Sequence, residues 1–167
     1  MTLHLVDRIA VEDEGDGDAV VCVHGLGGSS NSFNPLMPTL ARHRVIRPDM
    51  PGSARSARVE GPLSIARFVD ALQSVCSRLG VARAHWIGHS LGTIVCQHLA
   101  VAAPKLVRSL ALFGPLAAPP EAARSAVRAR GAKARSEGVA GMHEIALGLV
   151  NAALSADTRQ RSPLAVA

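Results

Sequence analysis

The sequence predicts an α/β fold, in which a mostly parallel sheet carries helices on both faces. Apolar runs of strand length alternate with segments whose apolar residues repeat at helical spacing, and this alternation favours the class. The continuous apolar run 19–23 is typical of a parallel strand that is buried on both faces. With 167 residues, 48% of them hydrophobic and 19% charged, the chain has the composition of a folded domain.

Strands and their turns account for most of the first two thirds of the chain. The first two strands form a hairpin, and the acidic turn 15–18 leads into the third. A glycine-rich loop, 24–30, follows that third strand directly. The predicted strands are 3–6, 9–14, 19–23, 44–47, 84–87 and 107–113.

Helices are predicted between these strands. The clearest helix repeats apolar residues at helical spacing over 65–79, with Ser64 as its cap and Gly80 at its end. Before it, Asn34 is the expected cap of a helix whose first residue is Pro35.

Two further helical segments follow. The first begins after residue 90 and is closed by Pro104, and the second is rich in alanine and arginine and runs to about Ala153. We therefore divide the chain into a core, 1–118, and a helical region, 119–167.

Residues 88–92, Gly-His-Ser-Leu-Gly, fit the pattern G-x-S-x-G and lie between a predicted strand and a predicted helix. A sharp turn there lifts Ser90 clear of both elements. Gly88 and Gly92 are needed because the strand and helix backbones approach closely. This context favours Ser90 as a catalytic nucleophile over an idle serine in an ordinary strand-to-helix turn.

The glycine-rich loop supplies a second candidate element. His24 and Gly25 directly follow a buried strand, so the loop can aim backbone N–H groups into the crevice beyond the strands' carboxyl ends. The N–H groups of Leu26 and Leu91 form the predicted oxyanion hole, because two such donors stabilise the charge that develops on a carbonyl oxygen. A plain tight turn is the alternative. The residues expected to line a substrate pocket are His24, Gly27 and His89.

Other classes of protein compete with this interpretation. Gly25-x-Gly27 follows a strand and Asp49 ends the next strand, which imitates a dinucleotide-binding fingerprint. Ser30 stands where the third glycine belongs, and the fingerprint leaves 88–92 without a role. A non-catalytic binding protein on the same scaffold, or a truncated remnant of an enzyme, is the other alternative.

No residue is assigned as the base that would activate Ser90, or as the acid that would orient such a base. None of the seven histidines follows a late strand, and Asp157 has no strand beside it. A serine hydroxyl is a poor nucleophile unless a neighbouring base takes its proton. We therefore name no general base and no acid among the residues of this chain.

Residues 20–113 resemble the α/β-hydrolase superfamily. Besides the loop at His24 and the turn at Ser90, the segment 49–56 resembles the D-x-x-G-x-G-x-S loop of that family. Ala54 stands where a second glycine is common, and Thr93 stands where another glycine often follows the nucleophile. A serine in the turn resembles the serine-nucleophile branch and not the branches that use a carboxylate.

The resemblance implies a hydrolase of carboxylic esters or lactones. The segment 122–142 resembles the start of the cap of 3-oxoadipate enol-lactonase-like enzymes, which implies a small anionic lactone as substrate. The resemblance also implies eight strands, with the acid and then the catalytic histidine on the last ones. Because we count six strands, the last two are expected to be missing. We expect the 167-residue chain alone to be inactive or nearly so.

A missing seventh strand would leave 107–113 as an apolar edge of the sheet. Exposed edges of this kind pair with other chains, so self-association through this strand is expected.

Composition excludes several other classes. Aromatic residues are 2%, too few for a nucleic-acid surface that interleaves basic and aromatic side chains. No run approaches the about 18 apolar residues of a membrane span. We expect no metal, no cofactor, no nucleic-acid partner and no membrane. An odd set of cysteines without metal or redox spacing favours a reducing cytoplasm; these are Cys22, Cys76 and Cys96.

The net charge of +5 comes entirely from residues 101–167. The basic residues of this part form either the solvated face of a helix or a wall near a site that attracts anions. The basic residues concerned are Arg124, Arg128, Arg130, Lys133 and Arg135.

Overall fold

A computed structural model of the chain describes residues 1–115 and 120–161. It divides into two compact units, Met1–Ala117 and Ala118–Ala167. The boundary that the sequence predicts after residue 118 lies outside the described residues. Among those residues, no helix combines the length and the apolar character that crossing a membrane requires.

The first unit is built on a six-stranded sheet with the spatial order β1-β2-β4-β3-β5-β6. β3 pairs in parallel with β4 and β5, and β5 pairs in parallel with β6. β1 and β2 form an antiparallel hairpin, which joins the sheet antiparallel to β4. The predicted mostly parallel sheet is confirmed. The strands are β1 (Thr2–Val6), β2 (Ile9–Glu14), β3 (Ala19–Val23), β4 (Arg44–Pro48), β5 (Ala84–His89) and β6 (Val107–Phe113).

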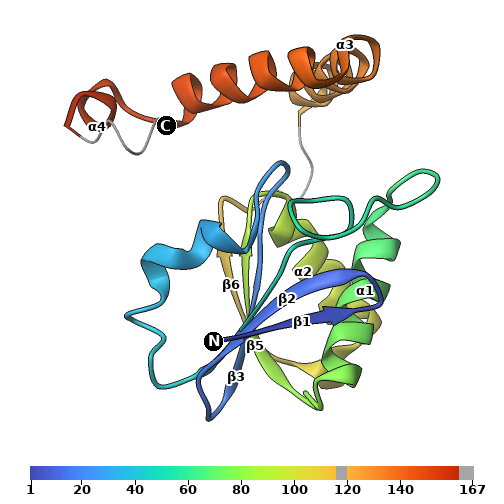
Figure 1. The fold of residues 1–167 in the computed structure, drawn as a ribbon, viewed down its shortest axis with the longest axis vertical. Coiled ribbons are helices and arrows are strands. Elements are labelled where there is room, and N and C mark those ends of the chain that lie inside the picture. Colours follow the sequence, from blue (N-terminus) through green and yellow to red (C-terminus); the bar gives the residue numbers. More distant parts are fainter. Residues whose placement is uncertain (116–119, 162–167) are drawn as a thin grey trace. The chain divides into compact units, whose positions relative to one another are not determined.

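Helices cover both faces of this sheet, as predicted. On one face, α1 (Ile65–Arg78) and α2 (Leu91–Ala102) pack against the strands and enclose the larger core cluster, which includes Trp86 and Leu72 (Figure 1). On the other face, the 3-10 helix η1 (Ser30–Leu36) and the turns after it cover a smaller cluster around Cys22 and Phe33. A second 3-10 helix, η2 (Pro104–Leu106), leads into β6.

One predicted helix start is confirmed and another is wrong. The Ser64 side chain accepts a hydrogen bond from the N–H of Arg67 and caps α1. The helix expected to begin at Pro35 with Asn34 as its cap is instead η1, which begins earlier and is capped by Ser29 in a reciprocal capping box with Ser32. Pro35 is tolerated inside η1 because a short 3-10 segment loses only a single hydrogen bond at a residue without an N–H.

The second unit is helical, as the sequence predicts. α3 (Glu121–Ala153) has a kink at Gly138, whose φ of 59° and ψ of −132° are not helical, and α4 (Ala156–Arg161) follows. A Cβ at Gly141 would lie 2.9 Å from the carbonyl oxygen of Lys133, so the two arms of α3 approach closely there.

Ion pairs within α3 involve two of its basic residues. Arg128 contacts Glu121 at 2.9 Å, and Lys133 contacts both Glu137 and Glu144 at 2.8 Å. These contacts join residues of one helix to each other, which favours the interpretation of the basic segment as a solvated helix face.

Candidate functional site

Ser90 lies on a sharp turn between β5 and α2. Its φ of 52° and ψ of −116° fall in the left-handed half of backbone space, which a residue with a side chain rarely occupies. The surrounding hydrogen bonds hold it there. Its N–H donates to the carbonyl oxygen of Phe113 at 3.0 Å, and its carbonyl accepts from the Thr93 N–H at 2.9 Å and the Thr93 hydroxyl at 2.7 Å. A maintained strain of this kind points to a functional position.

Glycine is required at the three positions that surround this turn. A Cβ on Gly88 would lie 2.7 Å from the Gly92 carbonyl oxygen, and one on Gly92 would lie 2.0 Å from the Val23 carbonyl oxygen. A Cβ on Gly25 would lie 3.0 Å from the Cβ of Ser90. The turn therefore packs directly on β3, and the glycine-rich loop lies against the serine.

The glycine-rich loop turns tightly at its tip. The N–H of Gly28 donates to the carbonyl oxygen of Gly25 at 3.1 Å, and Gly27 has a φ of +74°, so Leu26 stands at the tip with 74% of its surface exposed. Among residues 1–115, the N–H groups of Leu26 and Leu91 donate no hydrogen bond. Both are thus available as donors to a bound group. Their role as an oxyanion hole stays a prediction.

His24 occupies a different place from the one the sequence suggests. Its ring is buried, with 2% of the residue exposed, and both ring nitrogens are engaged. The N–H of Met50 donates to Nε2 at 2.9 Å, so Nδ1 carries the proton and donates to the Gly25 carbonyl oxygen at 2.8 Å. Burial lowers the pKa of this imidazole, which favours the same neutral form. His24 positions the loop and does not line a pocket.

The other two pocket candidates lie at the surface beside the loop. His89 is exposed, and its Nδ1 lies 3.3 Å from the position of a Cβ on Gly25. Gly27 is exposed too, and nothing lies within 4 Å of a Cβ built on it. Both are accessible to a molecule approaching Ser90, and contact with substrate stays a prediction for each.

A buried polar network behind the loop was missed by sequence reasoning. Asp49 is fully buried, and its carboxylate accepts from the Ser30 N–H at 2.8 Å and from the Arg55 Nε at 2.7 Å. Arg55 also donates to the Ser30 hydroxyl at 2.7 Å and to Glu12 at 2.8 Å. Glu12 in turn contacts Arg47 at 2.7 Å.

This network fixes both ends of the glycine-rich loop. Met50 holds the loop's first residue through the His24 ring, and Asp49 holds Ser30 at its other end. Burial alone would raise the pKa of Asp49, but hydrogen bonds from Arg55 and from backbone N–H groups outweigh it and lower the pKa. The carboxylate therefore stays charged. The D-x-x-G pattern directly after a strand was the signal that could have identified it.

The structure disfavours a dinucleotide site at this loop. In such a site an acidic residue at the end of the second strand must reach the ribose of the ligand. Asp49 has no exposed surface, and its carboxylate is occupied by Arg55 and Ser30. It serves the fold of the loop instead.

The candidate site holds a serine and backbone donors. Among residues 1–115 and 120–161, no side chain makes a hydrogen bond with the Ser90 hydroxyl, and no group of three or more His, Cys, Asp or Glu residues is arranged to bind a metal ion. Two histidines have other partners, because His85 bonds to Ser109 and His4 lies 3.3 Å from Asp13.

The chain is similar to known hydrolases. Residues 18–135 match a protein family described as alpha/beta hydrolase fold. A putative carbamate hydrolase RutD from Azorhizobium caulinodans is 39% identical over 102 residues, which are 60% of this chain and 38% of that protein. A hydrolase from Pseudomonas aeruginosa superposes with a TM-score of 0.84 at 26% identity, covering 98% of this chain and 63% of the other.

A lactonase is also among the similar structures. The N-acyl homoserine lactonase AidH superposes with a TM-score of 0.63 at 30% identity, covering 69% of this chain and 45% of that one. The chain thus spans less than half of this carbamate hydrolase and less than two thirds of either solved structure. The family match extends over more than half of the chain, and this protein belongs to the α/β-hydrolase family.

Proposed function

We propose that this chain carries the nucleophile and the oxyanion hole of a serine hydrolase that acts on carboxylic esters or lactones. One observation carries the proposal: Ser90 is held at a φ of 52° in a turn whose flanking glycines cannot be replaced, directly beside the glycine-rich loop. Catalysis is the use that best explains such a strained, accessible hydroxyl.

The proposed chemistry is acyl transfer. The Ser90 oxygen attacks the carbonyl carbon, and the negative charge that develops on the carbonyl oxygen is held by the N–H groups of Leu26 and Leu91. The ester C–O bond then breaks, the alcohol leaves with a proton, and water hydrolyses the acyl-serine. Each oxyanion donor contributes about 10²–10³ in turnover in enzymes of this type.

A lactone is the substrate class that we favour. The similar lactonase and the relative named as a carbamate hydrolase both cleave a carbonyl–heteroatom bond by name, which supports acyl chemistry here. The resemblance of residues 122–142 to the cap of enol-lactonases supports a small anionic lactone.

The chain alone is expected to react slowly. Among the described residues no histidine bonds to the Ser90 hydroxyl, and a serine protease stripped of triad members keeps only about 10³–10⁴ over the uncatalysed reaction. A longer polypeptide that adds a histidine and an acid would restore the full rate.

Labelling with a fluorophosphonate, read by intact mass, tests the nucleophile. We expect slow formation of a single adduct, faster when imidazole is added as an external base. The adduct should be absent in Ser90→Ala and unchanged in Ser77→Ala, which removes an exposed serine on α1. Equal labelling of Ser90→Ala and the parent chain would refute the nucleophile, and a binding protein on this scaffold would become the better interpretation.

A separate experiment tests the Leu26 N–H as an oxyanion donor. Leu26→Pro removes one N–H from the tip of the loop at a turn position that proline fits well. The imidazole-assisted labelling rate should fall by about 10²–10³ if this N–H holds the oxyanion. An unchanged rate would refute the role of Leu26 and leave that of Ser90 standing.

A further inference from the structure

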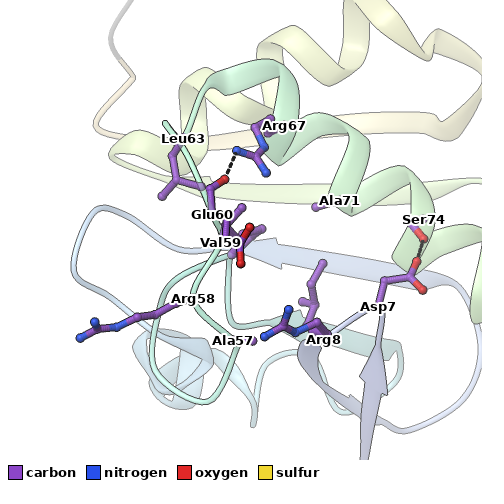
Figure 2. Close-up of a pocket in the computed structure, with 12 residues that line it drawn as sticks. Asp7, Arg8, Ala57, Arg58, Val59, Glu60, Leu63, Arg67, Ala71 and Ser74 are labelled. Atoms are coloured by element: carbon purple, nitrogen blue, oxygen red, sulfur yellow. Dashed lines mark hydrogen bonds between the residues drawn. The ribbon is translucent and has the colours of Figure 1, made fainter.

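A cleft of about 480 Å³ lies beside the β1–β2 hairpin. Its walls come from the β1–β2 turn, the loop before α1 and the first turns of α1 (Figure 2). In the sheet, β4 and β3 separate this hairpin from β5, which carries the turn at Ser90. The cleft is lined by apolar residues, among them Ile9, Pro51, Val59 and Leu63, and by the charged residues Asp7, Arg8, Arg58, Glu60 and Arg67.

The hairpin turn that borders this cleft is strained. Asp7 and Arg8 have φ values of 46° and 70°, a conformation in which asparagine and glycine are the usual residues. The turn is held by contacts to its neighbours. The Ser74 hydroxyl hydrogen-bonds to the Asp7 carboxylate, and the Ala57 N–H donates to the Arg8 carbonyl oxygen at 3.0 Å. An arginine kept at a position that suits glycine points to a use for its side chain.

Two arginines of the cleft have N–H donors available for a ligand. Arg67 donates from Nη1 to the carbonyl oxygens of Glu60 at 2.9 Å and Pro62 at 3.0 Å, which leaves its other N–H donors for a ligand. The Arg8 guanidinium makes no hydrogen bond or ion pair within residues 1–115 and 120–161. In Figure 2 Arg67 lies above and Arg8 below the labelled residues Val59 and Glu60, whereas Arg58 extends away from both arginines.

The acidic residues only partly offset this charge. The Asp7 carboxylate is engaged by Ser74 and lies 3.7 Å from Arg78 at the end of α1. Glu60 makes no ion pair among the described residues, so it is the group that would oppose an anion in the cleft.

We propose that this cleft is a second binding site, which takes a small organic anion. Arg8 binds the carboxylate or phosphate group of this ligand through charge-assisted hydrogen bonds, and Arg67 adds positive charge to the same cleft. The apolar part of the ligand lies on Ile9, Pro51 and Leu63. The apolar lining distinguishes such a ligand from a free inorganic anion. This site is independent of the chemistry at Ser90.

Phenyl phosphate is the probe, titrated into the full 167-residue chain and followed by backbone amide NMR shifts. We expect saturable shifts at the cleft and weaker binding of inorganic phosphate, which has no apolar part. The informative variant is Arg8→Gly, because glycine fits the positive φ. It should keep or raise the melting temperature while weakening phenyl phosphate binding about tenfold or more.

Two matched variants complete the test. Arg58→Ala removes the same charge from the side chain that points away, and it should change the affinity less than twofold. Glu60→Gln removes the opposing charge and should strengthen binding. Wild-type affinity in Arg8→Gly, equal losses in Arg8→Gly and Arg58→Ala, or no saturable shift with the parent chain would each overturn the proposal. Equal affinity for phenyl phosphate and inorganic phosphate would overturn the apolar part of it.

Discussion

β3 and β6 are both apolar strands that pair with β5, yet they differ completely in burial. Four of the five residues of β3 are buried, and β6 has no buried residue in the part of the chain that the structure describes. β3 lies between β4 and β5, whereas β6 ends the sheet and leaves Leu110 and Phe113 with 37% and 51% of their surface exposed.

This difference in burial matters because the turn at Ser90 contacts both β3 and β6. Gly92 packs against the backbone of β3, which is enclosed in the core, while the N–H of Ser90 donates to Phe113 at the end of β6. The turn at Ser90 is therefore held by a protected strand on one side and by an exposed edge on the other. Apolar composition predicted both strands, but only their positions in the sheet decide how much each is stabilised.

Replacing an interior residue and an edge residue with alanine should give the largest difference in the free energy of unfolding. Ile46 of β4 has no exposed surface, and Ile46→Ala should lower the free energy of unfolding by about 2–5 kcal/mol through lost burial and a cavity. Leu110→Ala on β6 should cost much less. Urea denaturation checks both variants, and equal losses would contradict the assignment of β6 as the exposed edge.

Removal of the buried Asp49 carboxylate should have the second-largest effect on stability. Asp49→Ala removes the acceptor for Arg55 and for the Ser30 N–H, and we expect a loss of about 3 kcal/mol. This loss lies at the low end of the range for breaking a buried ion pair, because the Arg55 side chain is 42% exposed. Asp70→Ala, on the exposed face of α1, is the control and should stay within about 0.5 kcal/mol. A small loss for Asp49→Ala would mean that the network does not stabilise the loop.

His24 makes stability depend on pH. Burial lowers its folded-state pKa below 6.5, so between pH 6.5 and that lowered value the unfolded chain binds a proton that the folded chain does not. The free energy of unfolding should be full above pH 6.5 and fall below it, by at most about 1.4 kcal/mol per pH unit. His24→Gln should flatten the profile between pH 5 and 8. An unchanged slope in that variant would contradict the buried neutral ring.

Local patterns explain which elements were predictable. Helix α1 follows from apolar periodicity and the Ser64 cap, and the turn at Ser90 follows from five adjacent residues, so each signal lies within a short stretch of chain. The start of η1 was misplaced because an Asn-Pro pair suggested a cap that Ser29 provides instead.

Long-range contacts explain what the sequence could not provide. Arg55 meets Glu12 across 43 positions and Ser30 across 25, and neither pair has a periodic signature. The same holds for His24, whose neutral ring is set by the N–H of Met50, 26 positions away. A histidine next to a glycine loop appears as a pocket residue in sequence, and only the folded neighbours show that both ring nitrogens are used.

Self-association through β6 should respond to a charge on its edge. An unpaired edge presents backbone N–H and C=O groups to another chain, and a lysine there opposes such pairing while leaving the monomer intact. Leu110→Lys should therefore reduce the associated fraction in light scattering and change the unfolding free energy by less than about 0.5 kcal/mol. Val101→Lys adds the same charge at an apolar residue of α2 that is 84% exposed, and it should leave association unchanged. If the parent chain is a monodisperse monomer, or if the two lysine variants behave alike, β6 is not the associating edge. Because the Ser90 N–H is bonded to Phe113 at the end of β6, a strand that pairs with this edge would also stabilise the turn at Ser90.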